Sequence, residues 1–380
     1  MMDFVIDGNA YLNVAISVTK SIAYRDKSIG SKYYVNDIFN DGKSILKEEV
    51  KIQFRNFCLN YMNSLIAPVG NKLNRVHLVF DSRSWRKNYI RKFFNDSNFE
   101  TSVAPAAFKY KGNRKKDDNI HIFFDYFQSE IAPHLMKDAG VNYYRIDSTE
   151  GDDIIAYLCE VIEGDIMVYT VDSDLKQLTY SPKNNIIVIY PKQMSKHKKL
   201  CVPQEFNPSH AEDETDNFFS LTESHIVTPA IDKTINLLKS RDYVEYKVDP
   251  VLEVFTKIFR GDKKDNIPKM DKMTPTKTSK MIDAIRSNYG NYSLNLLDDL
   301  DEKFIDFIVE NISILNKVND IDKLKDVRKH FMFNARIIRL SSKLFPKEVR
   351  VSLSSGIDSK KFMSFNSKKF NHIKNNPSLI

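Results

Sequence analysis

The sequence predicts an α/β fold in which a mostly parallel sheet is flanked by helices. Two observations predict it. Five continuous apolar runs of strand length recur along the first half of the chain, and segments with apolar residues at helical spacing fill most of the intervals between them. Apolar strands that alternate with amphipathic helices are typical of a parallel sheet buried on both faces. We expect this domain to occupy residues 1–191.

The individual elements follow from the local pattern. Each expected strand is a short apolar run, and each expected helix repeats apolar residues at intervals of three and four. The expected strands span residues 4–6, 76–80, 141–146, 166–171 and 186–190, and the expected helices span residues 45–66, 120–136 and 154–162.

The second half of the chain changes character. Residues 192–247 contain one basic cluster and one acidic cluster and have weak apolar periodicity, so we expect an insertion or long loop there. Residues 248–380 are predicted to form a helical region, with helices at 251–259 and 275–285 and two or three more from about residue 303. The tail from Lys360 is rich in Lys, Asn and Ser, and we expect it to be loosely ordered.

Composition limits the class of protein. The chain has 380 residues, a mass of 44.1 kDa, a formal charge of +7 and a pI near 8.9, which permits an anionic partner. No apolar run approaches the roughly 20 residues that span a bilayer, and the N-terminal residues lack the pattern of a secretory signal. The three cysteines fit no metal spacing. We therefore expect a monomeric cytoplasmic protein that does not interact with membranes.

Acidic residues stand at the ends of the predicted strands. Carboxyl ends of parallel strands meet at one edge of a sheet, where such folds bind ligands. Three of the acidic residues directly follow strand runs, three open the helix at 154–162 and three more lie farther along the chain. They are Asp7, Asp81, Glu150, Asp152, Asp153, Asp172, Asp174, Asp262 and Asp265.

Each carboxylate alone has a simpler explanation. Asp7 and Asp172 could cap the helices that follow their strands, and the three acids around Gly151 could interact with a helix dipole. The joint pattern favours a metal site, because many oxygen ligands without usable Cys or His spacing suit Mg²⁺ or Mn²⁺ rather than zinc. Two such ions can stabilise both the attacking and the leaving oxygen of a phosphoryl displacement.

Two basic segments flank these acids. The first interleaves cations with aromatic residues, a combination typical of single-strand binding, and continues into a run of lysines before the helix at 120–136. The second, from Lys257 to Lys280, has eight Lys or Arg against three Asp, which suits contact with duplex phosphates. The candidate contacts are Arg83, Arg86, Lys87, Arg91, Lys92, Lys109, Lys115, Lys263, Lys264, Lys269, Lys272 and Lys277.

At these residues the chain resembles the 5′-nuclease superfamily of flap endonucleases and 5′→3′ exonucleases, and within it the tailed-phage ribonuclease H branch that removes lagging-strand primers. The order and spacing of the motifs fit the resemblance over residues 1 to about 290. The matching motifs are Ile6-Asp7-Gly8, Val79-Phe80-Asp81, Trp85-Arg86-Lys87, Tyr110-Lys111-Gly112-Asn113-Arg114, Glu150-Gly151-Asp152-Asp153, Val171-Asp172-Ser173-Asp174 and Gly261-Asp262-Lys263-Lys264-Asp265-Asn266.

The resemblance implies a PIN-like catalytic domain with a helical arch at about residues 83–118, and a helix-turn-helix clamp for duplex DNA in the C-terminal region. It implies two Mg²⁺ ions, which Mn²⁺ can replace. By resemblance, Lys111 and Arg114 polarise the scissile phosphate and Arg86 and Lys87 grip the threaded strand. The first ion would be held by Asp7, Asp81, Glu150, Asp152 and Asp172, and the second by Asp174, Asp262 and Asp265, with Asp153 in support.

The sequence thus predicts a metal-dependent nuclease that acts on 5′ flaps and nicks in duplex DNA and on RNA primers paired to DNA, in replication or repair. Similarity to the phage branch suggests a viral protein in a bacterial cytoplasm, and the lysine-rich tail could dock a sliding clamp or a single-strand-binding protein. Two alternatives stay open: a PIN-type single-strand ribonuclease, and a non-catalytic DNA-binding protein whose acidic residues are helix caps.

Overall fold

The computed structural model describes residues 1–25, 38–40, 45–96, 110–111, 119–181, 183–191, 198–204 and 243–377. Within them the strands form one seven-stranded sheet, in the order β3-β2-β1-β4-β5-β6-β7. The parallel strands are β1 (Met2–Asp7), β2 (Leu73–Val79), β3 (Val141–Tyr144), β4 (Asp165–Tyr169) and β5 (Asn185–Tyr190). The predicted mostly parallel sheet is therefore confirmed.

The sheet changes direction beyond β5. Strand β6 (Lys198–Pro203) is antiparallel to β5, and β7 (Tyr243–Val248) pairs in parallel with β6. Both strands lie in the region where the sequence predicted an insertion or long loop. That prediction was wrong for these two segments, whose apolar residues are too few and too mixed with Lys and Glu to give a strand pattern. Residues 205–242 lie outside the described part of the chain.

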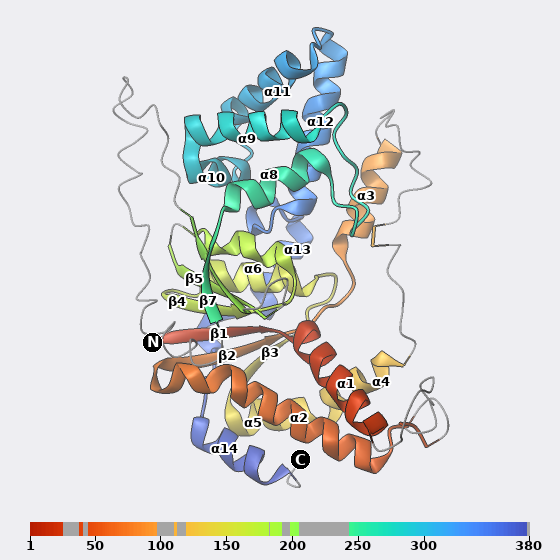
Figure 1. The fold of residues 1–380 in the computed structure, drawn as a ribbon, viewed down its shortest axis with the longest axis vertical. Helices are drawn as coiled ribbons and strands as arrows, with labels where there is room; N and C mark the ends of the chain where they lie inside the picture. The colour runs from red at the N-terminus through yellow and green to blue at the C-terminus, as the bar shows by residue number, and fades with distance from the viewer. Residues whose placement is uncertain are drawn as a thin grey trace.

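Helices cover both faces of the sheet (Figure 1). Alternate strand residues serve the two faces: Phe4 and Ile6 belong to one apolar cluster and Val5 to the other. One face packs against α1 (Gly8–Arg25), α2 (Glu48–Ile66), α4 (Ile120–Tyr126), the π-helical turn η4 (Phe127–Ile131) and α5 (Ala132–Ala139). The other face packs against α6 (Gly151–Val161) and α13 (Lys347–Gly356).

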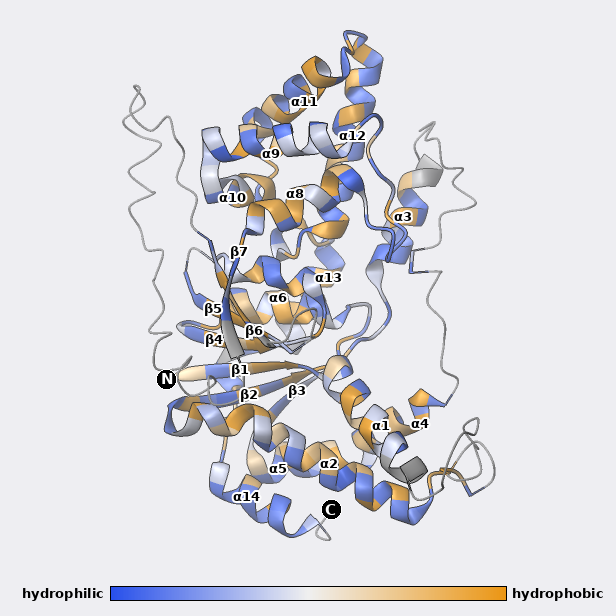
Figure 2. Ribbon diagram, in the orientation of Figure 1, coloured by the Kyte–Doolittle hydropathy of each residue, from blue (hydrophilic) through white to orange (hydrophobic). Residues whose placement is uncertain are grey.

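A second apolar core lies in a helical module at the top of Figure 1. Its largest side chains, Phe255, Phe259, Phe304 and Phe331, are all fully buried. Figure 2 shows helices that mix hydrophobic and hydrophilic residues in this module, as amphipathic packing requires. The module consists of α8 (Pro250–Arg260), α9 (Pro275–Tyr289), α10 (Ser293–Asp298), α11 (Glu302–Asn316) and α12 (Ile321–Ile338).

Helix α3 (Trp85–Asp96) lies beside this module (Figure 1). Tyr89 stacks on Phe333 of α12 at 6.1 Å between ring centroids, and Phe93 stacks on the same ring at 4.2 Å. Trp85 is buried against Phe345. The sequence predicted these aromatic residues as stacking surfaces for a single strand, but they are occupied with internal packing. Phe94 has its side chain outside the described part.

The C-terminal segment is ordered from residue 360 to 377, contrary to prediction. Asn142 in the outer strand β3 bonds both backbone groups of Met363, and Phe365 N donates to Asn74 O in β2. Helix α14 (Ser367–Asn375) then buries Phe370 and Ile373 against α2 and α5. Two apolar residues among many lysines give too weak a periodicity for the sequence to predict this helix.

The remaining short elements are 3₁₀ helices. They are η2 (Ala67–Lys72), η5 (Ser173–Thr179), η6 (Gly290–Tyr292), η7 (Ser342–Leu344) and η8 (Ser359–Lys361). Across the described residues, no helix is both long and apolar enough to cross a membrane.

Candidate metal and nucleic-acid site

The site begins at the carboxyl end of the central strand. Strand β1 pairs with β2 on one side and β4 on the other, so connections leave in opposite directions and open a crevice beyond the strand ends. Asp7 ends β1 and accepts hydrogen bonds from Ala10 N (3.0 Å) and from the Thr170 hydroxyl (2.8 Å). Thr170 also accepts from the backbone N–H of Asp172 at 2.9 Å. The Thr170 hydroxyl therefore links the carboxylate of Asp7 to the backbone of Asp172.

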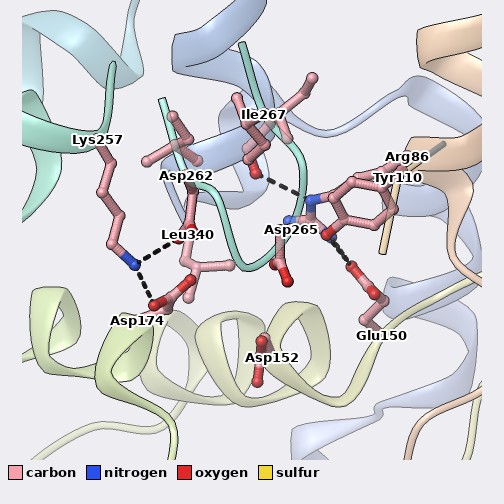
Figure 3. Close-up of a pocket in the computed structure, with 12 residues that line it drawn as sticks. Arg86, Tyr110, Glu150, Asp152, Asp174, Lys257, Asp262, Asp265, Ile267 and Leu340 are labelled. Carbon is pink, nitrogen blue, oxygen red and sulfur yellow. Dashed lines mark hydrogen bonds and ion pairs between the residues drawn. The ribbon is translucent and has the colours of Figure 1, made fainter. Parts of the chain in front are cut away.

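Asp81 follows β2 and meets the start of α6. Its Oδ1 accepts a hydrogen bond of 2.6 Å from Gly151 N. A Cβ atom at Gly151 would lie 2.9 Å from the same oxygen, so any larger residue there would displace the carboxylate. Helix α6 in turn presents Asp152 in its first turn, toward the same crevice (Figure 3). Glycine at this position therefore allows Asp81 and the helix start to come together.

Asp7, Asp81 and Asp152 form what we call the strand-end group, and their pKa values are raised. Burial raises the pKa of Asp7 to about 6, with further contributions from Asp81 and Asp172. Burial also raises the pKa of Asp152 well above its ordinary value, assisted by the same carboxylates. Asp81 is exposed, yet surrounding protein atoms and the charge of Glu150 raise its pKa as well. These residues repel one another when ionised.

Glu150, Asp172 and Asp262 behave differently, and we call them the paired group. Burial alone would raise the pKa of Glu150, but Arg86 and Lys111 outweigh it and lower the pKa to about 2. Lys264 lies 2.9 Å from Asp172, and Lys257 lies 3.1 Å from Asp262. In both aspartates the lysine overcomes the opposing effect of burial and lowers the pKa. Cations of the chain itself neutralise this group.

Asp174 and Asp265 complete the acidic set. Lys257 contacts Asp174 as well as Asp262, but burial and the charge of Asp172 still raise the pKa of Asp174. Asp265 is buried, and its carbonyl accepts a 3.2 Å hydrogen bond from Lys111 N. Figure 3 shows these residues around one pocket, with Glu150 and Tyr110 on one side, Asp174 and Lys257 on the other and Asp152 on the floor.

The turn that carries Asp262 and Asp265 is rigid. Asp262 and Ile267 exchange backbone hydrogen bonds of 3.1 and 2.8 Å. Gly261 has a φ of 66°, and a Cβ there would lie 2.3 Å from Ile267 O, so only glycine fits. The turn brings two carboxylates of the helical module to the pocket, and their predicted role as metal ligands stays a prediction.

The donor chemistry of these residues fits a hard divalent cation, because every side chain offered is a carboxylate. Within the described part of the chain, no three acidic, His or Cys residues stand close enough together to form a ready metal centre. Instead, Lys111, Lys257 and Lys264 contact the carboxylates of the paired group and of Asp174. Lysine ammonium groups therefore compensate the charge of these carboxylates in this structure.

Two predicted site residues have structural roles instead. The side chain of Arg86 is 2% exposed and lies between Glu150 and Asp153 at 2.7 Å from each. It offers little surface with which to grip a strand in this structure, and its contact with a threaded strand stays a prediction. Asp153 is fully buried and accepts from Trp85 Nε1 and Glu150 N, both at 3.0 Å. It holds the start of α6 together and does not face the pocket as a ligand would.

The other predicted contacts with nucleic acid fall into three sets: one half-buried lysine, three residues outside the described part of the chain, and the exposed cations. Lys277 is half-buried and donates to Asn316 at 2.8 Å. Lys109, Arg114 and Lys115 lie outside the described residues. The exposed cations are Arg83, Lys87, Arg91 and Lys92 around α3, and Lys263, Lys264, Lys269 and Lys272 around the turn between α8 and α9.

Lys257 is the site residue that sequence reasoning missed. It stands in the last turn of α8, in a stripe otherwise formed by Val254 and Ile258. A lysine beside the apolar face of a helix and five residues before an aspartate was the available signal. Its pKa is raised by Asp174 and Asp262 in spite of burial, so it stays charged.

Comparisons with known proteins give a fold likeness only. No protein-family model matches the chain, and no curated protein matches it. Among solved structures, a bacteriophage T5 protein crystallised with metal ions has a TM-score of 0.45 and 11% identity over 99% of this chain and 98% of that one. The T5 flap endonuclease in a complex with DNA and metal ions has the same TM-score and identity, over 99% and 97%. The T5 5′-exonuclease with bound zinc has a TM-score of 0.43 at 11% identity, over 100% and 99%.

These matches are too distant to assign ligands or substrates to this chain, so its chemistry rests on its own residues. At this level of similarity, the chain aligns over nearly its whole length with solved 5′-exonuclease and flap endonuclease structures.

Proposed function

We propose that this protein is a Mg²⁺-dependent 5′-nuclease. It would hydrolyse phosphodiester bonds at 5′ flaps and nicks in duplex DNA and in RNA primers paired to DNA. One observation supports this most: Asp7 ends β1, Asp81 follows β2, Asp152 stands in the first turn of α6, and the surrounding protein atoms and neighbouring carboxylates raise the pKa of each. In a chain with a net charge of +7, such a concentration of negative charge is expected at a site for divalent cations.

The residues of the strand-end group would hold one ion together with Glu150 and Asp172, and Asp174, Asp262 and Asp265 would surround a second. Mn²⁺ would substitute for Mg²⁺, because both prefer oxygen ligands. Bound ions would supply charge stabilisation for the attacking and leaving oxygens of an in-line displacement. The exact ligand set is part of the proposal.

The lysines of the site have a role before and during substrate binding. Lys111, Lys257 and Lys264 neutralise carboxylates in this structure. Phosphate groups and metal ions entering the pocket would compete for these pairs, which frees the ammonium groups to contact phosphate oxygens. Lys111 and Arg114 would orient the scissile phosphate, and Arg114 belongs to the part of the chain outside the description.

Duplex binding is proposed for the helical module. Lys263, Lys264, Lys269 and Lys272 are exposed around the turn between α8 and α9, next to the carboxylate pocket. Cations grouped in this way bind the backbone of nucleic acid without regard to sequence. The same turn carries Asp262 and Asp265, so contact with a duplex would place its backbone beside the pocket.

We place this activity in primer removal during DNA replication, or in repair, in the cytoplasm of a bacterial host of a phage. The protein would act as a monomer. A sliding clamp or a single-strand-binding protein is proposed as its partner at the C-terminal end, where Arg55 holds Pro377 O at 2.7 Å and the last three residues are outside the description.

The test is a digestion series on labelled 5′-flap duplex, nicked duplex, RNA-primed DNA and single-stranded RNA, with Mg²⁺ or with EDTA. The expected result is Mg²⁺-dependent cleavage of the first three substrates. Cleavage of single-stranded RNA alone would identify a PIN-type ribonuclease instead.

The matched variant is Asp152→Asn, which removes one negative charge and little volume. We expect it to lose cleavage and to bind flap DNA in EDTA as the unaltered protein does. Full Mg²⁺-dependent activity in the purified variant would refute the proposal.

A further inference from the structure

The C-terminal end of α12 contacts three elements that carry acidic residues of the site. They are the start of α6, the 3₁₀ helix η5 and the turn between α8 and α9. We call residues 334–340 the α12 end. Three buried polar side chains make the contacts: Asn334 is 0% exposed, Arg86 2% and Gln177 3%. A buried polar side chain is costly unless its hydrogen bonds are satisfied, so their placement here needs an explanation.

Asn334 joins the α12 end to the turn that carries Asp262 and Asp265. Its Nδ2 donates to Ile258 O at 2.7 Å and to Pro268 O at 3.0 Å. These two carbonyls lie on either side of the turn, one in the last part of α8 and the other just beyond Ile267. One amide group therefore fixes the separation of the two chain segments that flank the turn.

Gln177 joins the α12 end to η5, which follows Asp172 and contains Asp174. Its Nε2 donates to Ile338 O at 3.1 Å, and its Oε1 accepts from Leu340 N at 2.9 Å. Both ends of the amide are used, so the orientation of the side chain is determined. The bonds hold η5, and with it two carboxylates, at a set distance from α12.

Arg86 joins the α12 end to the start of α6. Its Nε donates to Ile337 O at 3.0 Å, and its two terminal nitrogens lie 2.7 Å from Glu150 and from Asp153. The planar guanidinium can satisfy all three acceptors at once, which a lysine could not do. Arg86 thereby ties Glu150, and the helix that carries Asp152, to the same place.

The carbonyl oxygens that accept the bonds from Arg86 and Gln177 lie at the C-terminal end of α12. Ile337 O and Ile338 O belong to the last turn of the helix, where carbonyls have no partner within the helix. Arg86 and Gln177 satisfy them from two other elements. The free carbonyls of a helix terminus thus become a common attachment point for segments that are distant in sequence.

We propose that the α12 end is the positioning element of the metal site, and that Asn334, Gln177 and Arg86 are its positioning residues. This inference rests on the proposed function. Carboxylates that repel one another separate unless the backbone that carries them is held, and metal sites require ligands placed to a fraction of an ångström. The α12 end supplies that constraint at the three elements it contacts, without touching a metal or a substrate.

The experiment measures Mg²⁺ binding in the absence of DNA. Trp85 is the single tryptophan of the chain and donates to Asp153 at the start of α6, so its fluorescence reports on the site. Calorimetry gives an independent dissociation constant. We expect Asn334→Leu to raise the dissociation constant for Mg²⁺ at least tenfold, while its affinity for flap DNA in EDTA stays within threefold.

Asn142→Leu is the matched control. Asn142 is also a buried asparagine whose Nδ2 donates to two backbone carbonyls, Val76 O at 3.3 Å and Met363 O at 2.9 Å, but these are remote from the pocket. Asn142→Leu makes the same change of shape and removes two donated bonds of the same kind, together with the bond that Asn142 Oδ1 accepts from Met363 N. We expect a comparable fall in Tm and a dissociation constant for Mg²⁺ within twofold of the unaltered protein.

Gln177→Met provides a second variant in case Asn334→Leu does not fold, and it should weaken Mg²⁺ binding in the same way. The proposal is overturned if a folded Asn334→Leu or Gln177→Met variant binds Mg²⁺ normally, or if Asn142→Leu weakens binding equally. Failure of the unaltered protein to bind Mg²⁺ would refute the proposed function instead, so the two failures are distinguishable.

Discussion

The strand-end group and the paired group consist of the same kind of side chain in one acidic region, yet their pKa values move in opposite directions. Asp7 has a pKa raised to about 6 by burial and by other carboxylates. Glu150 is also buried, but Arg86 and Lys111 lower its pKa to about 2. The difference shows that burial alone does not decide the charge state. Lys111 offsets only part of this effect at Asp81 and Asp152, so the strand-end group would gain most from a bound metal.

The largest effect is expected at the paired group. Glu150→Gln removes one of the two carboxylates that neutralise buried Arg86. The buried guanidinium would then have one carboxylate partner in place of two, and we expect the free energy of unfolding to fall by about 3 kcal/mol. Urea denaturation without metal measures it. An unchanged unfolding midpoint would show that Asp153 alone compensates Arg86.

A substitution in the strand-end group is expected to change the free energy of unfolding in the opposite direction. Asp7→Asn removes a charge that repels Asp81 and Asp172 at neutral pH. The shift from 3.8 to about 6 corresponds to an upper limit of about 3 kcal/mol, and the loss of acceptor capacity for Ala10 or Thr170 reduces it. We expect the metal-free variant to be more stable by about 1 kcal/mol and to show no stabilisation by Mg²⁺. A less stable variant would contradict the role of repulsion.

The pH dependence separates the two groups further. The folded pKa of Asp7 is above its unfolded value, so the stability that its proton confers is present below pH 3.8 and is lost as pH rises through about 6. The folded pKa of Glu150 is depressed, so its contribution is present above about pH 4.5 and is lost as pH falls through about 2. The stability difference from Asp7→Asn should therefore develop between pH 4 and 6, and that from Glu150→Gln between pH 2 and 4.5. Differences that develop in the same window would refute the assignment.

The smallest change in stability is expected for an exposed lysine that pairs with a carboxylate of the site. Lys264 is 54% exposed and pairs with Asp172, so Lys264→Met should change the free energy of unfolding by less than about 1 kcal/mol. Loss of one phosphate contact should reduce the slope of log affinity against log salt by about 0.9 for flap DNA. Lys347→Met on α13 is the control, with no expected change in slope. Equal slopes for both variants would exclude Lys264 from the DNA interface.

The sequence predicted the parallel strands and the convergence of acids at their ends because both depend on local patterns. Apolar runs mark strands, and Asp7 or Asp172 can be placed at a sheet edge from position alone. The burial of Arg86 could not be predicted, because an arginine next to an aromatic residue is equally typical of a surface. The contacts of Asn334 and Gln177 could not be predicted either, since side chains that bond distant backbone atoms leave no periodic signal.

The outer strand β3 has a consequence for biosynthesis. Its exposed side is bonded to Met363 through Asn142, and α14, which follows, packs against α2 and α5. These segments leave the ribosome more than 200 residues after β3 itself, as sequence numbers 142 and 363 require. The edge of the nascent sheet therefore stays uncovered until residue 363 has been synthesised. Unpaired strand edges promote association between chains, so early termination before residue 363 would yield products prone to aggregation.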